Sequence, residues 1–220
     1  MLTLTYQAFL HTLETKWRAG QHITVIGTTG SGKTIAIRDM LMMRRYVVVI
    51  ATKAKDPSLS KYRLPAIASW PPDYSQEKVM VWKKPKRLGD FGSQQALVYT
   101  VMNDIFFRGG YTVYFDDLFY VVHMLHLTRA IEMMYTQVRS QGVSLVASVQ
   151  RPSKVPLVSI NQASYLLVFN IKDIIDVQRV AKDVSMDWKE LQAAIATLQK
   201  YEFLFLEMGE QPIRVEKATE

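Results

Sequence analysis

The stretch VIGTTGSGKTIAIRDML, residues 25–41, leads from β-branched apolar residues through a glycine-rich turn into a helical pattern. The turn matches the motif G-x-x-x-x-G-K-[ST], and its fixed positions are Gly27, Gly32, Lys33 and Thr34. Residues 22–26 favour a buried strand before the turn, and apolar side chains recur at mainly helical spacing after it. This order of strand, loop and helix is the context in which the motif binds phosphate.

Backbone amides of such a phosphate loop can surround a phosphate, and the following helix directs the positive end of its dipole to the same point. Lys33 would reach the β- and γ-phosphates, and the Thr34 hydroxyl would bind Mg²⁺. We therefore expect ATP and Mg²⁺ as cofactors, although a glycine-rich turn that binds nothing is the alternative. The residues assigned to the nucleotide are Gly27, Thr28, Thr29, Gly30, Ser31, Gly32, Lys33 and Thr34.

The composition is that of an ordinary soluble globular protein of 220 residues, long enough for one large domain. About half of the residues are apolar, but no uninterrupted run reaches the roughly 18 residues of a membrane helix. Residues 1–20 mix charged and apolar side chains as an amphipathic helix does, and not as a signal peptide. Cysteine is absent, which excludes disulfides and thiolate metal sites. The missing export signal and the expected nucleotide favour a cytoplasmic location.

A formal charge of +7 favours polyanionic partners through long-range attraction. The segment WKKPKR, residues 82–87, holds four cations beside an aromatic residue, and two more lysines follow the predicted strand 46–51. Such clusters would contact DNA phosphates without reading sequence, or they are solvated basic loops. The candidate DNA contacts are Lys53, Lys55, Lys83, Lys84, Lys86 and Arg87.

Strand patterns alternate with helix patterns along the chain, without an internal repeat or a linker. The strands are expected at residues 22–26, 46–51, 78–82, 112–115, 143–148 and 165–170. The helices are expected at residues 33–44, 93–107, 127–141, 174–183 and 187–199.

Several of these strands are continuously apolar, as strands of a parallel sheet covered on both faces are. The alternation predicts right-handed crossovers and a three-layer α/β fold with a central, mainly parallel sheet. Residues 201–206 and 211–216 read as a C-terminal antiparallel β-hairpin. We therefore expect an N-terminal helical extension at 1–21, a P-loop ATPase core at 22–183, and a C-terminal helix and hairpin at 184–220 packed on that core.

A phosphate loop needs an acidic partner for its metal, and the apolar strand in YTVYFDDLFYV ends in Asp116 and Asp117. This pattern fits a Walker B motif, in which the first carboxylate holds Mg²⁺ through water and the second deprotonates the attacking water. Most ATPases of the additional-strand class have Glu at the second position, so Asp117 is the weaker assignment. Two acids that only end a strand or cap a helix are the alternative.

Polar residues also follow the predicted strand 143–148, at the edge where open α/β sheets bind ligands. The Gln150 amide can donate to a phosphate and accept from water, so it is suited to sensing the γ-phosphate or placing the lytic water. A loop residue without a role is the alternative.

Residues 139–156, RSQGVSLVASVQRPSKVP, resemble the HerA–FtsK superfamily of DNA-pumping ATPases. Its members carry a stretch of the form R-x-x-G-[IV]-x-L-[IV]-x-[AS]-x-Q-R-P-S on the strand after Walker B. The matching positions are Arg139, Gly142, Val143, Leu145, Val146, Ser148, Gln150, Arg151, Pro152 and Ser153. The likeness runs from residue 27 to about residue 183, with weaker matches at residues 52–58 and 165–183.

The resemblance implies a RecA-like, additional-strand ATPase that moves DNA. A chain this short, with no transmembrane segment, winged-helix tail or N-terminal barrel, looks most like the genome-packaging ATPases of membrane-containing icosahedral viruses. Those proteins drive double-stranded DNA into preformed capsids. The implied partners are double-stranded DNA and a capsid vertex or portal protein, and the implied location is the host cytoplasm or the virion.

Phosphoryl transfer needs positive charge beyond a lysine and Mg²⁺, and an arginine finger contributes roughly 10³ to 10⁵ in kcat. In ring ATPases the finger usually comes from the neighbouring subunit. We expect Arg139 in this role because its helix should run along the subunit edge; Arg151 and Arg179 are the other candidates. A finger in trans predicts a homo-oligomeric ring, pentameric or hexameric.

Three other functions fit parts of the sequence. A P-loop kinase would need an arginine-bearing lid and an acceptor pocket, which the sequence does not indicate. An assembly protein that binds ATP with little hydrolysis fits Asp117, and a related motor of conjugation or repair fits the superfamily motif. His123 and His126 lie in an apolar stretch, where packing residues are expected and not a metal site.

Overall fold

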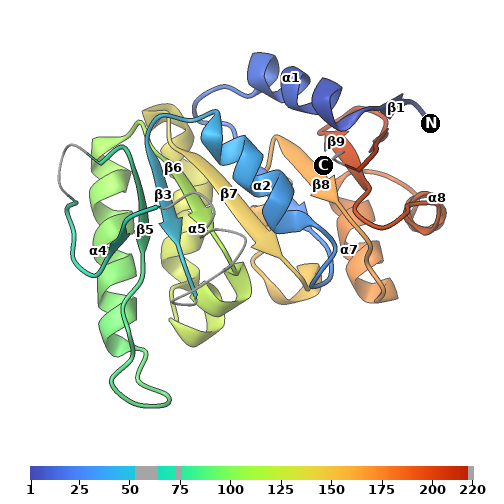
Figure 1. Cartoon of the computed structure of the whole chain (residues 1–220). Helices are drawn as coiled ribbons and strands as arrows, with labels where there is room; N and C mark the ends of the chain where they lie inside the picture. Colours follow the sequence, from blue (N-terminus) through green and yellow to red (C-terminus); the bar gives the residue numbers. More distant parts are fainter. Residues whose placement is uncertain (53–63, 73–75, 218–220) are drawn as a thin grey trace.

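The structure, a computed structural model, describes residues 1–52, 64–72 and 76–217. In these ranges the chain forms three layers, with helices on both faces of one central sheet (Figure 1). No helix of these ranges is both long enough and apolar enough to cross a membrane. The three layers confirm the predicted α/β fold.

Ten strands of the described chain form the sheet in the order β1-β10-β9-β8-β2-β7-β6-β3-β5-β4. Every pairing from β8 through β4 is parallel, whereas β9 pairs antiparallel with both β8 and β10. The strands are β1 (Thr3–Leu4), β2 (Ile23–Ile26), β3 (Val47–Ile50), β4 (Ala66–Ile67), β5 (Lys78–Val81), β6 (Thr112–Phe115), β7 (Ser144–Val149), β8 (Tyr165–Val168), β9 (Phe203–Glu207) and β10 (Ile213–Val215).

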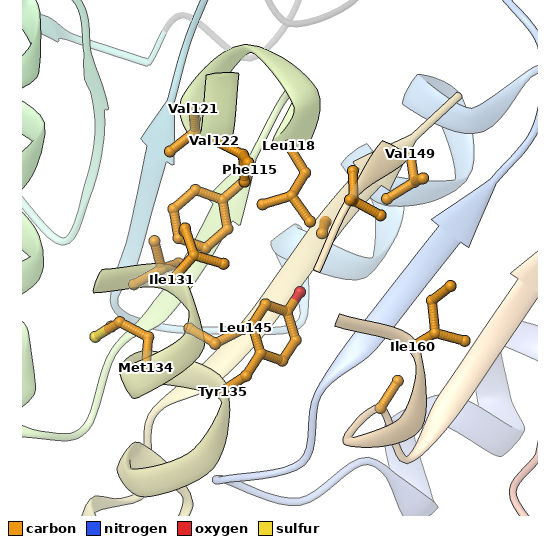
Figure 2. Packing of buried hydrophobic residues seen from close by; sticks show 14 of the residues in the cluster. Phe115, Leu118, Val121, Val122, Ile131, Met134, Tyr135, Leu145, Val149 and Ile160 are labelled. Atoms are coloured by element: carbon orange, nitrogen blue, oxygen red, sulfur yellow. The ribbon is translucent and has the colours of Figure 1, made fainter. Parts of the chain in front are cut away.

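Helices cover both faces because alternate side chains of each buried strand point to opposite sides. On one face, Val25 and Val49 pack with α1 and α2. On the other, Phe115 and Leu145 pack with Ile131, Met134 and other side chains of the remaining helices (Figure 2). The helices are α1 (Tyr6–Lys16), α2 (Lys33–Met42), α4 (Gly92–Arg108), α5 (Thr128–Gln137), α6 (Val158–Asn161), α7 (Ile174–Asp183) and α8 (Trp188–Ala196), with a π-helical turn Tyr120–Met124 and 3-10 turns Val138–Gln141 and Pro152–Lys154.

The predicted strands and helices are all present, most with shifted ends. Strand 112–115 and helix 174–183 have the predicted bounds, and β9 and β10 form the predicted hairpin. The helix expected at 127–141 ends as an α-helix at Gln137 and continues as a 3-10 turn, after which Gly142 adopts a left-handed φ of 69°. The π-helical turn, the short helix α6, the 3-10 turn Pro152–Lys154 and the short strands β1 and β4 were not predicted.

The N-terminal segment is tied to the C-terminal hairpin. Strand β1 pairs in parallel with β10, and the Phe9 ring of α1 packs edge-on against the rings of Phe203 and Phe205 of β9, at 5.0 and 5.3 Å between centroids. Aromatic pairs in this geometry add to the stabilisation from burial. The C-terminal hairpin and β1 thus extend the sheet beyond β8, and α1 packs on one face of this extension. The division of the chain into three domains stays a prediction.

His22, directly before β2, is fully buried and joins two strands at the amino edge of the sheet. Its Nδ1 atom accepts a hydrogen bond from the amide of Leu145 at 3.1 Å, so the imidazole is neutral at this nitrogen. Burial lowers the pKa of His22 to about 4, and the nearby Arg139 acts in the same direction. Protonation of this histidine therefore opposes folding.

Between pH 4 and 6.5 His22 is protonated in the unfolded chain and neutral in the folded chain. The free energy of unfolding therefore falls as the pH falls through that range. We expect the wild type to lose about 3 kcal/mol of the free energy of unfolding across this range. His22→Asn keeps an acceptor but has no group that titrates, so most of this pH-dependent loss should be absent in the variant. Urea unfolding at pH 7 and pH 4.5 measures both. The exposed His11→Asn serves as control, and an unchanged pH slope in His22→Asn would contradict the assignment.

Candidate nucleotide site

The phosphate loop joins β2 to α2 at the carboxyl edge of the parallel strands. Its first amides continue the sheet: Gly27 N–H donates to the Val149 carbonyl at 3.0 Å, and Thr28 N–H donates to the Asn170 carbonyl at 3.2 Å. A Cβ atom on Gly27 would lie 2.6 Å from the Cβ of Phe169, so no side chain fits there. The start of the loop is therefore fixed between the ends of β7 and β8, and glycine is required by close packing.

Lys33 begins α2 and is buried, with its Nζ atom folded back into the loop. The ammonium donates to the carbonyls of Gly27 and Thr28 at 2.7 and 2.8 Å. Burial lowers the pKa of Lys33 to about 8, while the carboxylates of Asp117 and Asp116 act in the opposite direction. Phosphate oxygens are strong acceptors for such an ammonium, so the lysine is placed as the motif requires.

The loop fits a phosphate on a further observation. The Ser31 hydroxyl oxygen is buried with no hydrogen-bond partner in the described part of the chain, and it lies 3.0 Å from the position of a Cβ on Gly27, inside the loop. A buried hydroxyl without a partner is costly and normally marks a missing ligand or water. Gly30 and Gly32 have left-handed φ values of 79° and 104°, which open the loop around this hydroxyl.

Asp116 follows β6 and is held on the α2 face of the sheet. Its two carboxylate oxygens accept hydrogen bonds from the Tyr114 hydroxyl at 3.1 Å and from the Thr52 hydroxyl at 3.2 Å. Tyr114 lies two residues earlier on the same strand, so both side chains point to the same face, where the phosphate loop begins. The sequence pattern did not predict Thr52 or Tyr114 as partners. Thr52 lies two residues after β3 and directly after the expected strand 46–51, and a polar residue at the end of an expected strand is the signal that was used for Gln150.

Asp117 has a structural contact of its own. One carboxylate oxygen accepts from the Tyr120 N–H at 3.3 Å, at the start of the π-helical turn. The expectation that an acid could cap the following helix therefore holds as well, and π-helical turns are frequent at functional sites. Because Asp117 also acts on the pKa of Lys33, the two acids and the lysine share one electrostatic environment.

Gln150 lies directly after β7 and contacts the phosphate loop. Its amide oxygen accepts a hydrogen bond from the Thr29 hydroxyl at 3.1 Å. The structure thus brings Lys33, Asp116 and Gln150 to one edge of the sheet, from strands β2, β6 and β7, which are neighbours in the order β6-β7-β2.

The residues fit Mg²⁺ in the way expected for a phosphate-bound metal. No group of three or more His, Cys, Asp or Glu within the described ranges could hold a metal alone. Mg²⁺ in such sites keeps several waters and takes one or two protein oxygens together with the substrate phosphates. Thr34 and Asp116 could supply these protein oxygens.

The three arginine candidates lie in different places. Arg139 precedes β7 and donates to the Gln162 carbonyl at 3.0 Å, so it lies at the amino edge of the sheet, opposite its own phosphate loop. Arg151 binds the carboxylates of Asp173 and Asp176 at 2.7 and 2.6 Å, beside Gln150. A role of Arg139 in hydrolysis therefore requires the phosphate loop of another subunit.

Arg179 and the described basic residues lie on elements other than the phosphate loop. Arg179 of α7 forms an ion pair with Asp183 at 3.5 Å. The segment 82–91, after β5, extends beyond the carboxyl edge of the sheet (Figure 1), with Lys84, Lys86 and Arg87 exposed and Lys83 half-buried. Lys53 and Lys55 lie outside the described residues.

No protein-family model matches the sequence, and no curated protein matches it. Solved structures do resemble the fold. The genome-packaging NTPase B204 of Sulfolobus turreted icosahedral virus 2, in complex with sulfate, superposes with a TM-score of 0.68 at 18% identity, covering 91% of this chain and 98% of that one. The same NTPase was also solved with AMP and with AMPPCP.

Bacterial proteins share this fold. VirB4 of Thermoanaerobacter pseudethanolicus matches with a TM-score of 0.67 at 9% identity, over 90% of each chain. The pCW3 conjugation coupling protein TcpA matches with a TM-score of 0.58 at 16% identity, over 92% of this chain and 60% of that one. The likeness confirms the P-loop ATPase fold that the HerA–FtsK resemblance implied.

Replacing Gly27 by Ala should disturb the loop through the collision with Phe169. We expect about 1–3 kcal/mol of destabilisation and roughly tenfold weaker binding of a fluorescent ATP analogue. Gly110→Ala is the matched control, because Gly110 has a φ of 75° with no atom within 4 Å of its Cβ position and lies before β6 at the other edge. Equal affinities of Gly27→Ala and the wild type would contradict the tight fit.

Proposed function

We propose that this chain is an ATP-hydrolysing motor of the HerA–FtsK type that moves double-stranded DNA, and that its task is to package a viral genome into a preformed capsid. The observation that carries the proposal is the meeting of Lys33, Asp116 and Gln150 at one edge of the sheet. The likeness to a packaging NTPase over almost the whole of both chains supports it.

Each residue of this edge has a role in phosphoryl transfer. Lys33 would neutralise charge on the β- and γ-phosphates, and Asp117 would accept the proton of the attacking water. Gln150, held by Thr29, would orient that water. Thr34 and Asp116 would hold Mg²⁺, which would supply positive charge to stabilise the developing negative charge.

DNA would lie against the basic segment 82–91. The exposed cations of this segment extend from the carboxyl edge that also carries the phosphate loop. A change at the nucleotide would therefore act on the segment 82–91. Contacts to phosphates alone make binding independent of sequence and steeply dependent on salt. The subunits would form a ring of five or six in the host cytoplasm or on the virion, with a capsid vertex or portal protein as docking partner.

Two observations favour other functions. Asp117 caps the π-helical turn, which fits a protein that binds ATP with little turnover. The likeness to the conjugation coupling protein TcpA fits a motor that works in conjugation. Steady-state ATP hydrolysis would exclude the first function. The second would differ from packaging in the partner on which the ring docks.

The proposal is tested by ATP hydrolysis titrated with double-stranded DNA while particle size is followed. We expect turnover that rises with DNA and with assembly, and no turnover in Lys33→Ala, because the charge on the transferring phosphate is then uncompensated. Turnover that ignores DNA at every particle size, or full turnover in Lys33→Ala, would contradict the motor.

The same titration tests the basic segment 82–91. The double change Lys84→Ala and Arg87→Ala should reduce the DNA stimulation and lower the slope of log affinity against log salt by about two. Arg45→Ala with Arg108→Ala removes the same charge from exposed positions at the amino edge and should keep the wild-type slope.

A finger in trans predicts complementation between two inactive variants. Lys33→Ala subunits keep Arg139, and Arg139→Ala subunits keep the phosphate loop, so about a quarter of the interfaces in a random equal mixture are complete. Mixing should therefore restore part of the hydrolysis that each variant lacks. Mixed rings of the normal size without any recovery would exclude Arg139 as the finger.

A further inference from the structure

A cavity of about 250 Å³ lies beside the phosphate loop, on the side away from the catalytic acids. Its walls are residues 28–31 of the loop, Asn170 after β8, and the segment 198–202 that leads into β9. Neither Asp116 nor Gln150 lines it. The phosphate loop thus forms one wall of the cavity, while Asn170 and the segment 198–202 have no role in phosphoryl transfer.

The strand order says which part of a nucleotide reaches this cavity. Asp116 and Gln150 follow β6 and β7, on one side of β2, while the cavity lies at β8 and β9, on the other side. Strand β9 runs antiparallel to β8, so the segment before it returns to the carboxyl edge. A nucleotide with its γ-phosphate toward β7 therefore extends its nucleoside toward β8 and β9.

Tyr201 is the unusual residue of this segment. Its φ is 73°, a left-handed value that bulky residues rarely adopt and that clusters at ligand and active sites. Its ring borders the phosphate loop, because a Cβ on Gly32 would lie 3.2 Å from the Tyr201 Cδ1 atom. With 42% of the residue exposed, the ring keeps accessible surface.

The neighbouring residues hold this conformation. The buried carboxylate of Glu202 accepts from the Gln199 N–H at 2.7 Å and from the Arg214 guanidinium at 2.6 Å. The Glu202 N–H returns a bond to the Gln199 carbonyl, which closes a turn around Tyr201. The Lys200 ammonium lies 4.8 Å from the centre of the Tyr201 ring, and this flexible, exposed cation can give way to another group that stacks there.

We propose that this cavity binds the nucleoside of ATP and that the Tyr201 ring stacks on the base. The inference rests on the proposed function, since it assigns the base-binding part of the same site. Stacking on an aromatic ring accepts every base, because each base has a π-face. Tyr201 is therefore a binding residue for the nucleoside and has no part in phosphoryl transfer.

The test compares a ligand that has a base with one that has none. Dissociation constants of AMPPCP and of inorganic tripolyphosphate are measured by calorimetry with Mg²⁺ for the wild type and Tyr201→Gly. Glycine removes the ring and accepts the left-handed φ, so the fold is kept. We expect about tenfold weaker AMPPCP binding, unchanged tripolyphosphate binding, and wild-type values for Tyr201→Phe.

Controls separate this inference from the proposed function. Tyr46→Ala, an equally exposed tyrosine at the amino edge, should change neither constant. Unchanged AMPPCP binding in Tyr201→Gly, or equal weakening of both ligands, would overturn the base-stacking role, and the second outcome would mean that the ring only supports the loop. A wild-type protein that binds neither ligand would instead overturn the proposed function.

Discussion

Strand β2 is bonded in parallel on both sides, and this double pairing fixes where the phosphate loop begins. The first two amides of the loop continue the pairing, one to Val149 of β7 and one to Asn170 just after β8, and Phe169 leaves no room for a side chain at Gly27. The loop must therefore turn at one point, and α2 must start with Lys33 buried against it. Nucleotide chemistry at this edge depends on that constraint, because a loop that started elsewhere would separate the lysine from the acids.

The two sides of β2 carry different side chains at the carboxyl edge of the sheet. Neighbours β7 and β6 present Gln150 and Asp116, which suit the reacting phosphate and its metal. Neighbours β8 and β9 present a cavity with an aromatic side chain, which suits a nucleoside. Arg151 joins the sides, since it ties the segment after Gln150 to Asp176 at the start of α7, after β8. A nucleotide in this orientation would contact segments after β2, β6, β7 and β8 and the segment before β9, and these contacts would give hydrolysis a route to move them.

Local patterns were sufficient for the longer strands and helices, and for Asp116 and Gln150, which directly follow β6 and β7. Continuous apolar runs predicted the parallel strands, and the same edge then collected Lys33, Asp116 and Gln150. What could not be predicted depends on pairing between distant segments: β1 with β10, Tyr114 and Thr52 with Asp116, and Tyr201 with Gly32. A two-residue strand has no periodicity of its own, and a left-handed tyrosine contradicts the propensity of its residue type.

The proposed mechanism requires a triphosphate between Lys33 and Asp116, with its terminal group next to Gln150. A crystal structure with AMPPCP and Mn²⁺ in place of Mg²⁺ tests it most directly, because the anomalous signal of manganese locates the metal independently of the protein. We expect manganese between Thr34 and Asp116. We also expect the γ-phosphate within hydrogen-bond distance of Lys33 and Gln150. Manganese and phosphates bound on another face, or phosphates in the loop with Gln150 turned away from them, would contradict it.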